Sequence, residues 1–224
     1  MARGRLIVFE GPEGAGKTTQ LRHLDAWLDV RGVEHLCVRE PGGTALGDAV
    51  RRLLLDAAGP MDLRAEALLF MASRAALVGE VIAPALARGV TVLADRYFLS
   101  TYAYQVAGRG LNESEVRAAN ALATRGVTPD LTLVFAVPAG ARRARAERRG
   151  APDRIEQAGD DFHARVERAF ATFLSPNWQG AHAESGPVVA VDGDGTEAVV
   201  FERVLAALGA RWPEFAGVLD GSRS

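Results

Sequence analysis

The chain has 224 residues, of which 48% are hydrophobic and 24% charged, as in an ordinary soluble globular protein. The length predicts one α/β domain with a small subdomain, and the net charge of −2 argues against a dedicated nucleic-acid binder. The single cysteine, Cys37, excludes an intramolecular disulfide and is predicted to be a small core residue. We expect no signal peptide and no stretch long enough to span a membrane, and therefore a cytoplasmic protein.

Short apolar runs alternate with longer segments of helical period, which is typical of a parallel sheet covered on both faces. The predicted strands are Leu6–Glu10, His35–Arg39, Val90–Asp95, Leu131–Val137 and Val188–Asp192. The predicted helices are 17–31, 44–55, 63–88, 112–125, 138–149, 160–175 and 196–210. Because ligands of such sheets bind beyond the carboxyl ends of the strands, we expect the functional residues just after these strands.

A glycine-rich segment, "GPEGAGKT", follows the first predicted strand and matches the P-loop pattern G-x-x-x-x-G-K-[ST]. Its backbone N–H groups and the next helix's N-terminus would surround phosphate oxygens. We predict that Lys17 reaches the β- and γ-phosphates, that Thr18 binds Mg²⁺ and that Thr19 donates to the α-phosphate. The predicted triphosphate-binding residues are Gly11, Pro12, Glu13, Gly14, Ala15, Gly16, Lys17, Thr18 and Thr19.

The predicted helix at 63–88 is apolar around most of its circumference, so we expect it to be deeply buried. Arg74 interrupts this surface, and a buried arginine requires an anion or several hydrogen-bond acceptors. Phe70 lies one turn earlier on the same face. The two side chains could together stack on a base and bond to it, although core packing alone would also explain Phe70.

The third predicted strand ends in "VTVLADRY", which places Asp95 and Arg96 at its carboxyl end. The carboxylate suits the Mg²⁺ region, and the guanidinium suits a second phosphate group, because its planar fork binds phosphate at two points. An ordinary surface pair is the alternative. The sequence has no Asn-Lys-x-Asp element, which argues against a GTPase.

An arginine-rich segment, "ARRARAERRGAPDRIE", follows the fourth predicted strand and contains Arg142, Arg143, Arg145, Arg148, Arg149 and Arg154. Phosphoryl transfer spreads negative charge over the phosphate oxygens. Arginines that approach these oxygens accelerate the reaction by a factor of about 10³–10⁵. We therefore predict a short lid at about 142–155, which would also exclude water. The alternative is a solvated basic surface.

Seven segments occur in an order and spacing that resemble bacterial thymidylate kinases: "FEGPEGAGKTTQ", "REPGGT", "LLFMASR", "DRYFLSTYAYQ", "GRG", "PDLTLVF" and "DRIEQ". The resemblance runs from about Leu6 to Phe173. It implies the three-layer α/β/α fold of P-loop kinases with a five-stranded parallel sheet. We expect a single domain at 1–212 and a C-terminal tail at 213–224, of which the last segment, "LDGSRS", is expected to be frayed. The resemblance also implies a homodimer that transfers the γ-phosphate of ATP to dTMP with Mg²⁺, giving dTDP for dTTP synthesis.

The same resemblance implies how the acceptor base is held. Phe70 would stack on thymine and Arg74 would bond to its O4. Thr101 and Gln105 would lie along the base, with Thr101 near N3. Tyr104 would close off the 2′ side of the sugar and so disfavour ribonucleotides.

Other matching positions would hold the sugar and phosphate of the acceptor. Glu13 would accept a hydrogen bond from the 3′-hydroxyl, and Arg96 would hold the phosphate. Pro41 and Gly42 would shape the loop against the substrate, with Arg39 nearby. Asp95 would help to organise Mg²⁺.

The transition-state charge would be met by lid arginines, because no arginine occurs in the P-loop. Arg149 matches best the arginine that approaches the transferring phosphate. Arg145 and Arg148 would also lie against ATP. The acceptor is already a phosphate oxygen, so no strong base is required.

Two other functions stay open from the residues. A deoxynucleoside kinase would use Glu10 as a base toward a 5′-hydroxyl, and a nucleotide-binding regulatory module would need no catalysis. The histidines show no metal-ligand spacing and are expected to sit apart from the site; they are His23, His35, His163 and His182.

Overall fold

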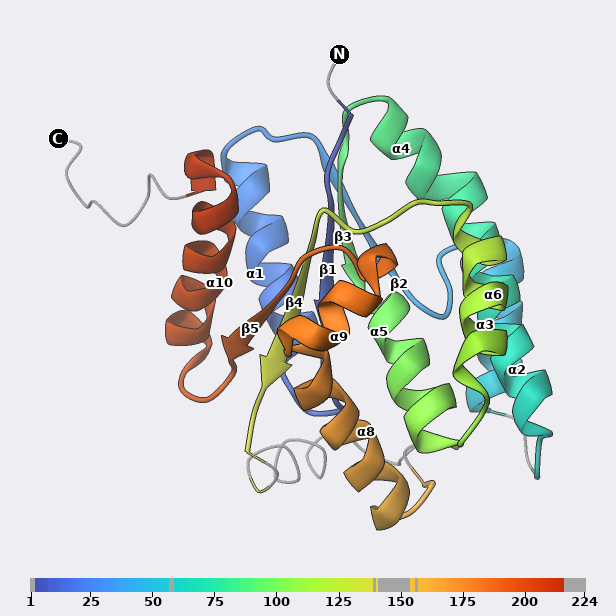
Figure 1. Ribbon diagram of the computed structural model, residues 1–224. Helices are drawn as coiled ribbons and strands as arrows, with labels where there is room; N and C mark the ends of the chain where they lie inside the picture. Colours follow the sequence, from blue (N-terminus) through green and yellow to red (C-terminus); the bar gives the residue numbers. More distant parts are fainter. Residues whose placement is uncertain (1–2, 57–58, 139, 141–153, 156, 216–224) are drawn as a thin grey trace, which may run out of the picture.

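A five-stranded parallel sheet forms the centre of the computed structural model (Figure 1). The strand order is β2-β3-β1-β4-β5, with β1 Leu6–Glu10, β2 His35–Arg39, β3 Thr91–Asp95, β4 Leu131–Ala136 and β5 Val188–Asp192. The structure describes residues 3–56, 59–138, 140, 154–155 and 157–215. All five predicted strands are confirmed; β3 begins one residue later and β4 ends one residue earlier than the apolar runs indicate.

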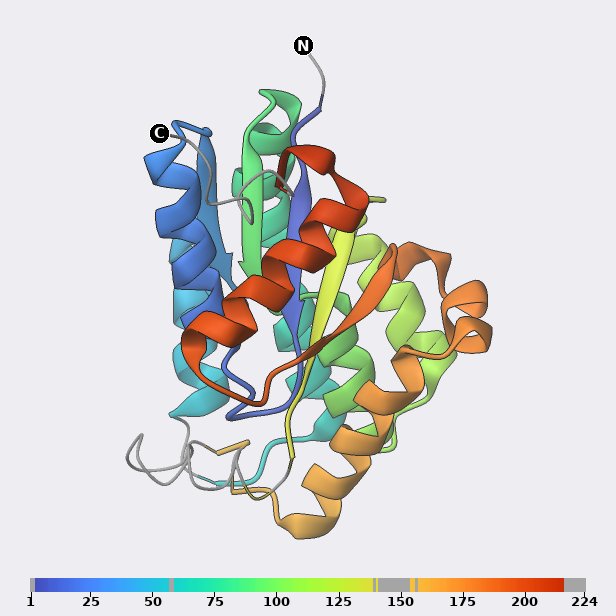
Figure 2. The same cartoon turned by 90° about the vertical axis from the view of Figure 1, so that its left-hand side faces the viewer.

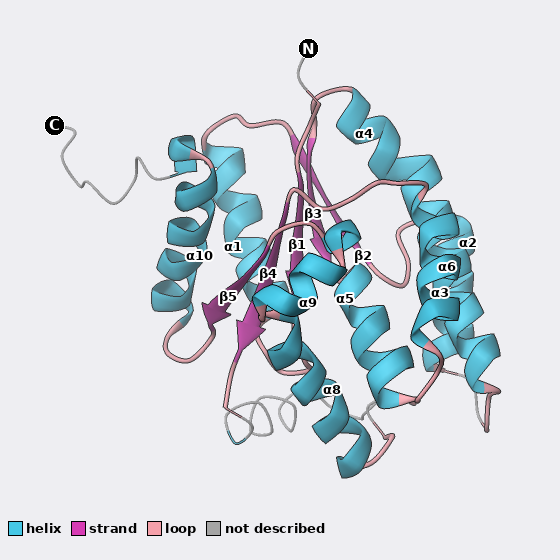
Figure 3. Ribbon diagram, in the orientation of Figure 1, coloured by secondary structure: helices cyan, strands magenta, loops and turns pink. Residues whose placement is uncertain are grey.

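Helices cover both faces of the sheet, which confirms the three-layer architecture (Figure 2). One face packs against α1 (Lys17–Val30) and α10 (Glu197–Arg211). The other face packs against helices that include α3 (Leu63–Leu77) and α8 (Asp160–Phe173). The remaining helical segments, drawn with the others in Figure 3, are α2 Ala45–Leu55, η1 Val78–Ile82, α4 Ala83–Ala87, α5 Phe98–Thr101, η2 Tyr102–Gly108, α6 Glu113–Thr124, α9 Pro176–Ala181, η3 Ala183–Ser185 and η4 Pro213–Phe215.

The central strand β1 shows why its sequence is apolar without alternation. Leu6 and Val8 point into the layer that contains α3, whereas Ile7 and Phe9 point into the layer that contains α1. All four side chains are fully buried. Burial of each stabilises the fold by about 1.5–3 kcal/mol, so both layers depend on this strand.

The long apolar segment predicted at 63–88 forms α3, the π-helical η1 and α4 in succession. Pro84 cannot donate a backbone hydrogen bond, and the π-helical turn directly precedes it in the chain. Within the described residues, Leu63–Ala87 is long and apolar enough to cross a membrane by length and composition alone. The expectation that no such stretch exists is therefore wrong, although this helix packs Leu77 and Ile82 into the protein core.

A helix that the sequence did not indicate follows β3 directly and consists of α5 and η2. No local residue caps its N-terminus. Instead Glu10, at the end of β1, accepts hydrogen bonds from the backbone N–H groups of Tyr97 (2.8 Å) and Ser100 (3.0 Å). A cap supplied from 90 residues away leaves no signal in a local sequence window.

The C-terminal segment continues beyond the predicted domain end at 212. The ring of Phe215 stacks on Trp27 with centroids 5.5 Å apart, so η4 packs against α1. Apart from residues 138 and 140, the predicted helix at 138–149 lies outside the described residues, and so does most of the predicted lid. Residues 216–224 lie outside them as well.

Candidate phosphate-transfer site

The parallel register places the carboxyl ends of β1, β2 and β3 side by side. Asp95 is paired with Phe9 on one side and with Arg39 on the other. The P-loop therefore begins next to the "DRY" segment, as predicted for a site at this edge of the sheet.

The P-loop has the backbone conformation that its glycines allow. Gly11 has φ 140°, and a Cβ there would lie 2.9 Å from the carbonyl oxygen of Phe135. Gly16 has φ 87° and directly precedes α1. Lys17 is buried and donates from Nζ to the carbonyl oxygen of Pro12 at 2.9 Å. The N-terminus of α1 therefore lies at the end of the P-loop, and a helix N-terminus favours binding of a phosphate group.

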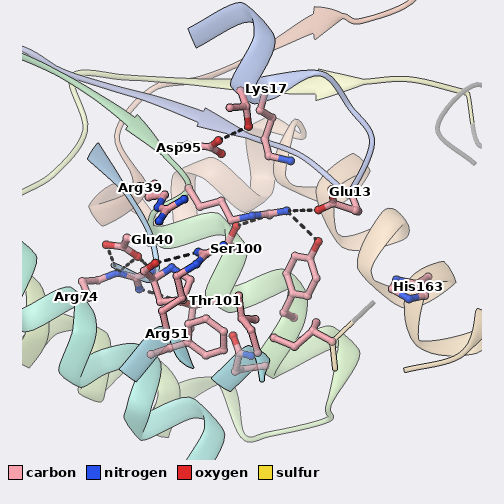
Figure 4. Close-up of a pocket in the computed structure, with 18 residues that line it drawn as sticks. Glu13, Lys17, Arg39, Glu40, Arg51, Arg74, Asp95, Ser100, Thr101 and His163 are labelled. Atoms are coloured by element: carbon pink, nitrogen blue, oxygen red, sulfur yellow. Dashed lines mark hydrogen bonds and ion pairs between the residues drawn. The ribbon is translucent and has the colours of Figure 1, made fainter. Parts of the chain in front are cut away.

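Thr18 and Asp95, the two residues predicted as metal ligands, meet beside this loop. The Thr18 hydroxyl donates to Asp95 Oδ2 at 2.6 Å (Figure 4). Mg²⁺ binds few protein oxygens and completes its shell with water and substrate phosphates, so this pair fits the ion. Among the described residues, no group of three or more His, Cys, Asp or Glu side chains could hold a metal without a substrate.

A cavity of about 300 Å³ opens between the P-loop, the loop after β2, α3 and α5 (Figure 4). All predicted acceptor residues line it: Glu13, Arg39, Pro41, Phe70, Arg74, Arg96, Thr101, Tyr104 and Gln105. Lys17, Thr18 and Asp95 line it too, so the P-loop and the predicted acceptor residues border one space. Six lining residues were missed by sequence reasoning: Glu40, Arg51, Leu55, Ser100, Ile155 and His163.

His163 was expected to sit apart from the site, and this expectation is wrong because His163 lines the cavity. It lies in the first turn of α8, and the packing of α8 against η2 brings it to the cavity. Arg51 lies one turn and a half along α2 and donates to the carbonyl oxygen of Pro41 at 3.0 Å. A helical-wheel position toward the "EPGG" loop could have identified Arg51.

Arg96 stands at the centre of the site in a left-handed backbone conformation, with φ 75°. Its guanidinium donates to Ser100 Oγ at 2.9 Å and to Glu13 Oε2 at 3.3 Å, and lies over the ring of Tyr104. Burial alone would lower the pKa of Arg96, but nearby Tyr104, Asp95 and Glu10 outweigh it and raise the pKa. Arg96 is therefore a permanent cation between the P-loop and the acceptor end of the cavity.

Glu10 accepts hydrogen bonds from the turn that follows Arg96. Besides the two backbone bonds from Tyr97 and Ser100, it accepts a bond from Ser100 Oγ at 2.7 Å. Its side chain is fully buried and does not line the cavity. A base for a 5′-hydroxyl must reach its proton, so the geometry argues against the deoxynucleoside kinase alternative.

Arg74 is 1% exposed and confirms the expectation that a buried arginine needs several acceptors. Both oxygens of Glu40 accept from it. Its other N–H groups donate to Thr101 Oγ1 (2.8 Å), Asn120 Oδ1 (2.6 Å) and the carbonyl oxygen of Tyr97 (2.8 Å). These bonds engage all five N–H groups, so the predicted bond to thymine O4 would have to share one of them.

The charge of Arg74 is secured by the same contacts. Burial alone would lower its pKa, but the charge and hydrogen bonds of Glu40 outweigh burial and raise the pKa. The half-buried Phe70 lies on the same helix and lines the cavity. A flat ring and a fixed cation therefore border the same end of the cavity.

Arg154, the last arginine of the predicted lid, is bonded away from the P-loop. It donates to Glu66 Oε2 at 2.7 Å and to the carbonyl oxygen of Leu54 at 2.8 Å. The other lid arginines lie outside the described residues: Arg142, Arg143, Arg145, Arg148 and Arg149. The predicted roles of Arg145, Arg148 and Arg149 stay predictions.

Cys37 is not the core residue that its strand suggested. It lies exposed on the edge strand β2, where its thiol donates to Asp25 Oδ1 at 3.0 Å. Partial burial of the sulfur and the bond to Asp25 raise its pKa to about 12. The thiol is therefore protonated at neutral pH and is no candidate nucleophile.

Comparison with known proteins shows which family this chain is similar to. The family model described as Thymidylate kinase matches residues 9–187. A thymidylate kinase from Deinococcus radiodurans is 46% identical over 211 residues, covering 94% of this chain and 99% of the relative. A thymidylate kinase from Desulforudis audaxviator is 44% identical over 228 residues, covering 97% and 98%. One from Carboxydothermus hydrogenoformans is 45% identical over 168 residues, covering 75% and 83%.

Proposed function

This chain belongs to the thymidylate kinase family, and from that premise we propose that it transfers the γ-phosphate of ATP to dTMP. The observation that carries the proposal is the shared cavity. Lys17 of the P-loop and the Phe70–Arg74 end of α3 line the same space, so a donor and an acceptor nucleotide can meet there.

Different residues of the cavity bind the phosphate, the sugar and the base of the acceptor nucleotide. Arg96 receives the acceptor phosphate beside the P-loop, and Glu13, already bonded to Arg96, accepts from the 3′-hydroxyl of the sugar. Tyr104 stands over Arg96 and closes the sugar side. Phe70 stacks on the base. Positioning two phosphate groups in line, with their charge neutralised, supplies most of the catalysis in such a transfer.

Mg²⁺ fits beside Thr18 and Asp95, and when bound it neutralises charge on the β- and γ-phosphates. Thr18 would hold the ion through its hydroxyl, and Asp95 would hold the ion or its water shell through its carboxylate. Lys17 contacts the β- and γ-phosphates. Arg149, with Arg145 and Arg148, supplies further positive charge to the transferred group.

We also propose that two copies of the chain associate through α3 and α6. These helices pack together and carry exposed leucines: Leu68 is 61% exposed on α3 and Leu122 is 81% exposed on α6. Exposed apolar side chains on adjacent helices favour a protein interface. A cytoplasmic location, and the absence of nucleic-acid and membrane partners, stay predictions.

The test is an ADP-release assay with Mg²⁺-ATP and four acceptors: thymidine, dTMP, dUMP and AMP. We expect dTMP to dominate and dUMP to be used less well, because one methyl group in an apolar pocket is worth about 1–3 kcal/mol. Turnover of thymidine without dTMP would contradict the acceptor site described here. ATP binding without any turnover would instead support the regulatory-module alternative.

A further inference from the structure

The carboxylate of Glu66 lies at the centre of a buried polar cluster on α3. Its side chain is 0% exposed. It accepts from Gln105 Nε2 at 3.2 Å, from Arg109 Nε and Nη2 at 3.0 Å each, and from Arg154 Nη2 at 2.7 Å. Burial alone would raise the pKa of Glu66, but hydrogen bonds from Arg109 and Arg154 outweigh it and lower the pKa. Glu66 is therefore a carboxylate at neutral pH.

This contact fixes which way the Gln105 side-chain amide faces. A carboxylate only accepts hydrogen bonds, so the amide must turn its NH₂ group, not its oxygen, toward Glu66. The described residues provide no hydrogen bond to Gln105 Oε1. Gln105 is 2% exposed, and its Oε1 is not among the fully enclosed side-chain atoms without a partner in the described residues, which belong to Gln20, Trp27, Asn120 and Ser185.

Gln105 lines the cavity together with Phe70, Arg74 and Thr101. Its accessible oxygen is thus a hydrogen-bond acceptor at the end of the cavity where a base would lie. Thr101 adds a donor, because its oxygen already accepts from Arg74 and its own O–H remains to be directed elsewhere. This part of the cavity wall therefore offers a hydrogen-bond acceptor, Gln105 Oε1. One helix turn earlier it offers a hydrogen-bond donor, the Thr101 hydroxyl.

We propose that Glu66 is a positioning residue for base selection, acting by presenting the oxygen of Gln105 to position 3 of the acceptor base. This inference rests on the proposed function. Thymine carries an N3–H that this oxygen accepts. Cytosine has a lone pair at N3, which the oxygen repels, so the arrangement selects thymine or uracil over cytosine. Glu66 itself touches no substrate.

The test compares kcat/KM for dTMP and dCMP in the full-length Glu66→Gln variant with Mg²⁺-ATP. A glutamine at position 66 offers both an oxygen and an NH₂ group, so the Gln105 amide is no longer held in one orientation. We expect the preference for dTMP over dCMP to fall about tenfold or more, while KM for ATP stays unchanged. Glu184→Gln is the matched control, because it weakens a carboxylate–arginine pair with Arg117 outside the cavity and should leave the preference unchanged.

A merely structural role would give a different result. If Glu66→Gln lowers turnover of both nucleotides in parallel, the inference is overturned and the proposed function stands. A wild-type protein that does not use dTMP would overturn the proposed function instead.

A second variant covers the case that Glu66→Gln does not fold, which a thermal melt would reveal. Gln105→Met keeps the length of the side chain and removes the amide, with Glu66 intact. It should lose the same preference for dTMP, and adding Glu66→Gln to it, where that protein folds, should cause no further loss. An unchanged preference in Gln105→Met would overturn the inference.

Discussion

Three buried carboxylates determine where the site's cations and polar side chains lie. Glu10 holds the turn that carries Arg96, Glu40 neutralises Arg74, and Glu66 fixes Gln105. The sequence allowed us to predict that Arg74 needs acceptors, since a buried guanidinium always does. It did not indicate that Glu40 would be the main one, because nothing local relates residues 34 positions apart.

The role of Glu10 leads to a prediction about Glu10→Gln. The two oxygens of Glu10 receive three hydrogen bonds, whereas a glutamine has one oxygen and turns an NH₂ group toward donors. We expect the free energy of unfolding to fall by about 1–3 kcal/mol and KM for dTMP to rise, because Arg96 loses its support. Urea unfolding and steady-state kinetics measure the two effects. The exposed Glu202→Gln is the control, and equal stability of both variants would contradict the proposed role.

At the scale of elements, strands were easier to predict than the helix that carries Thr101 and Gln105. A buried strand such as β1 is a short apolar run, and the P-loop has its own spacing. The helix formed by α5 and η2 has neither a local cap nor a solvent-exposed face, because α6 and α8 pack against η2. Only the tertiary structure accounts for it.

The exposed surface of α3 and α6 gives a prediction about association. Leu122→Glu places a charge on each copy at the proposed symmetric interface, so its effect is doubled. We expect light scattering to give twice 23.8 kDa for the wild type and 23.8 kDa for the variant at micromolar concentration. Val30→Glu is the control, since Val30 is 84% exposed at the end of α1, on the other layer. A dimer that survives Leu122→Glu would contradict this interface.

At the scale of the whole molecule, the layer order and the edge of the sheet that binds ligands follow from the sequence. The strands, their parallel arrangement and the P-loop together fix them. The opposite wall of the cavity does not follow from the sequence, because His163 reaches it only through the packing of α8 against η2. Contacts of that kind depend on how layers dock, which no local pattern encodes.

The buried cluster around Glu66 joins several of these elements and predicts an acid sensitivity. The folded-state pKa of Glu66 lies below its ordinary value of 4.5, so its contribution is fully present above that pH and is lost as the pH falls below it. Each unit of lowering is worth about 1.4 kcal/mol. We expect urea-unfolding free energies between pH 6 and pH 3 to fall more steeply for the wild type than for Glu66→Gln. Parallel slopes would contradict the ion pairs with Arg109 and Arg154.

The left-handed backbone of Arg96 has a consequence for which changes the chain can tolerate. Glycine would adopt φ 75° at no steric cost, so at this position it would relieve the backbone while removing the guanidinium. Selection for a more stable fold would therefore favour glycine at this position, whereas selection for turnover would favour arginine. Mutants enriched for thermal resistance alone would drift toward loss of activity here.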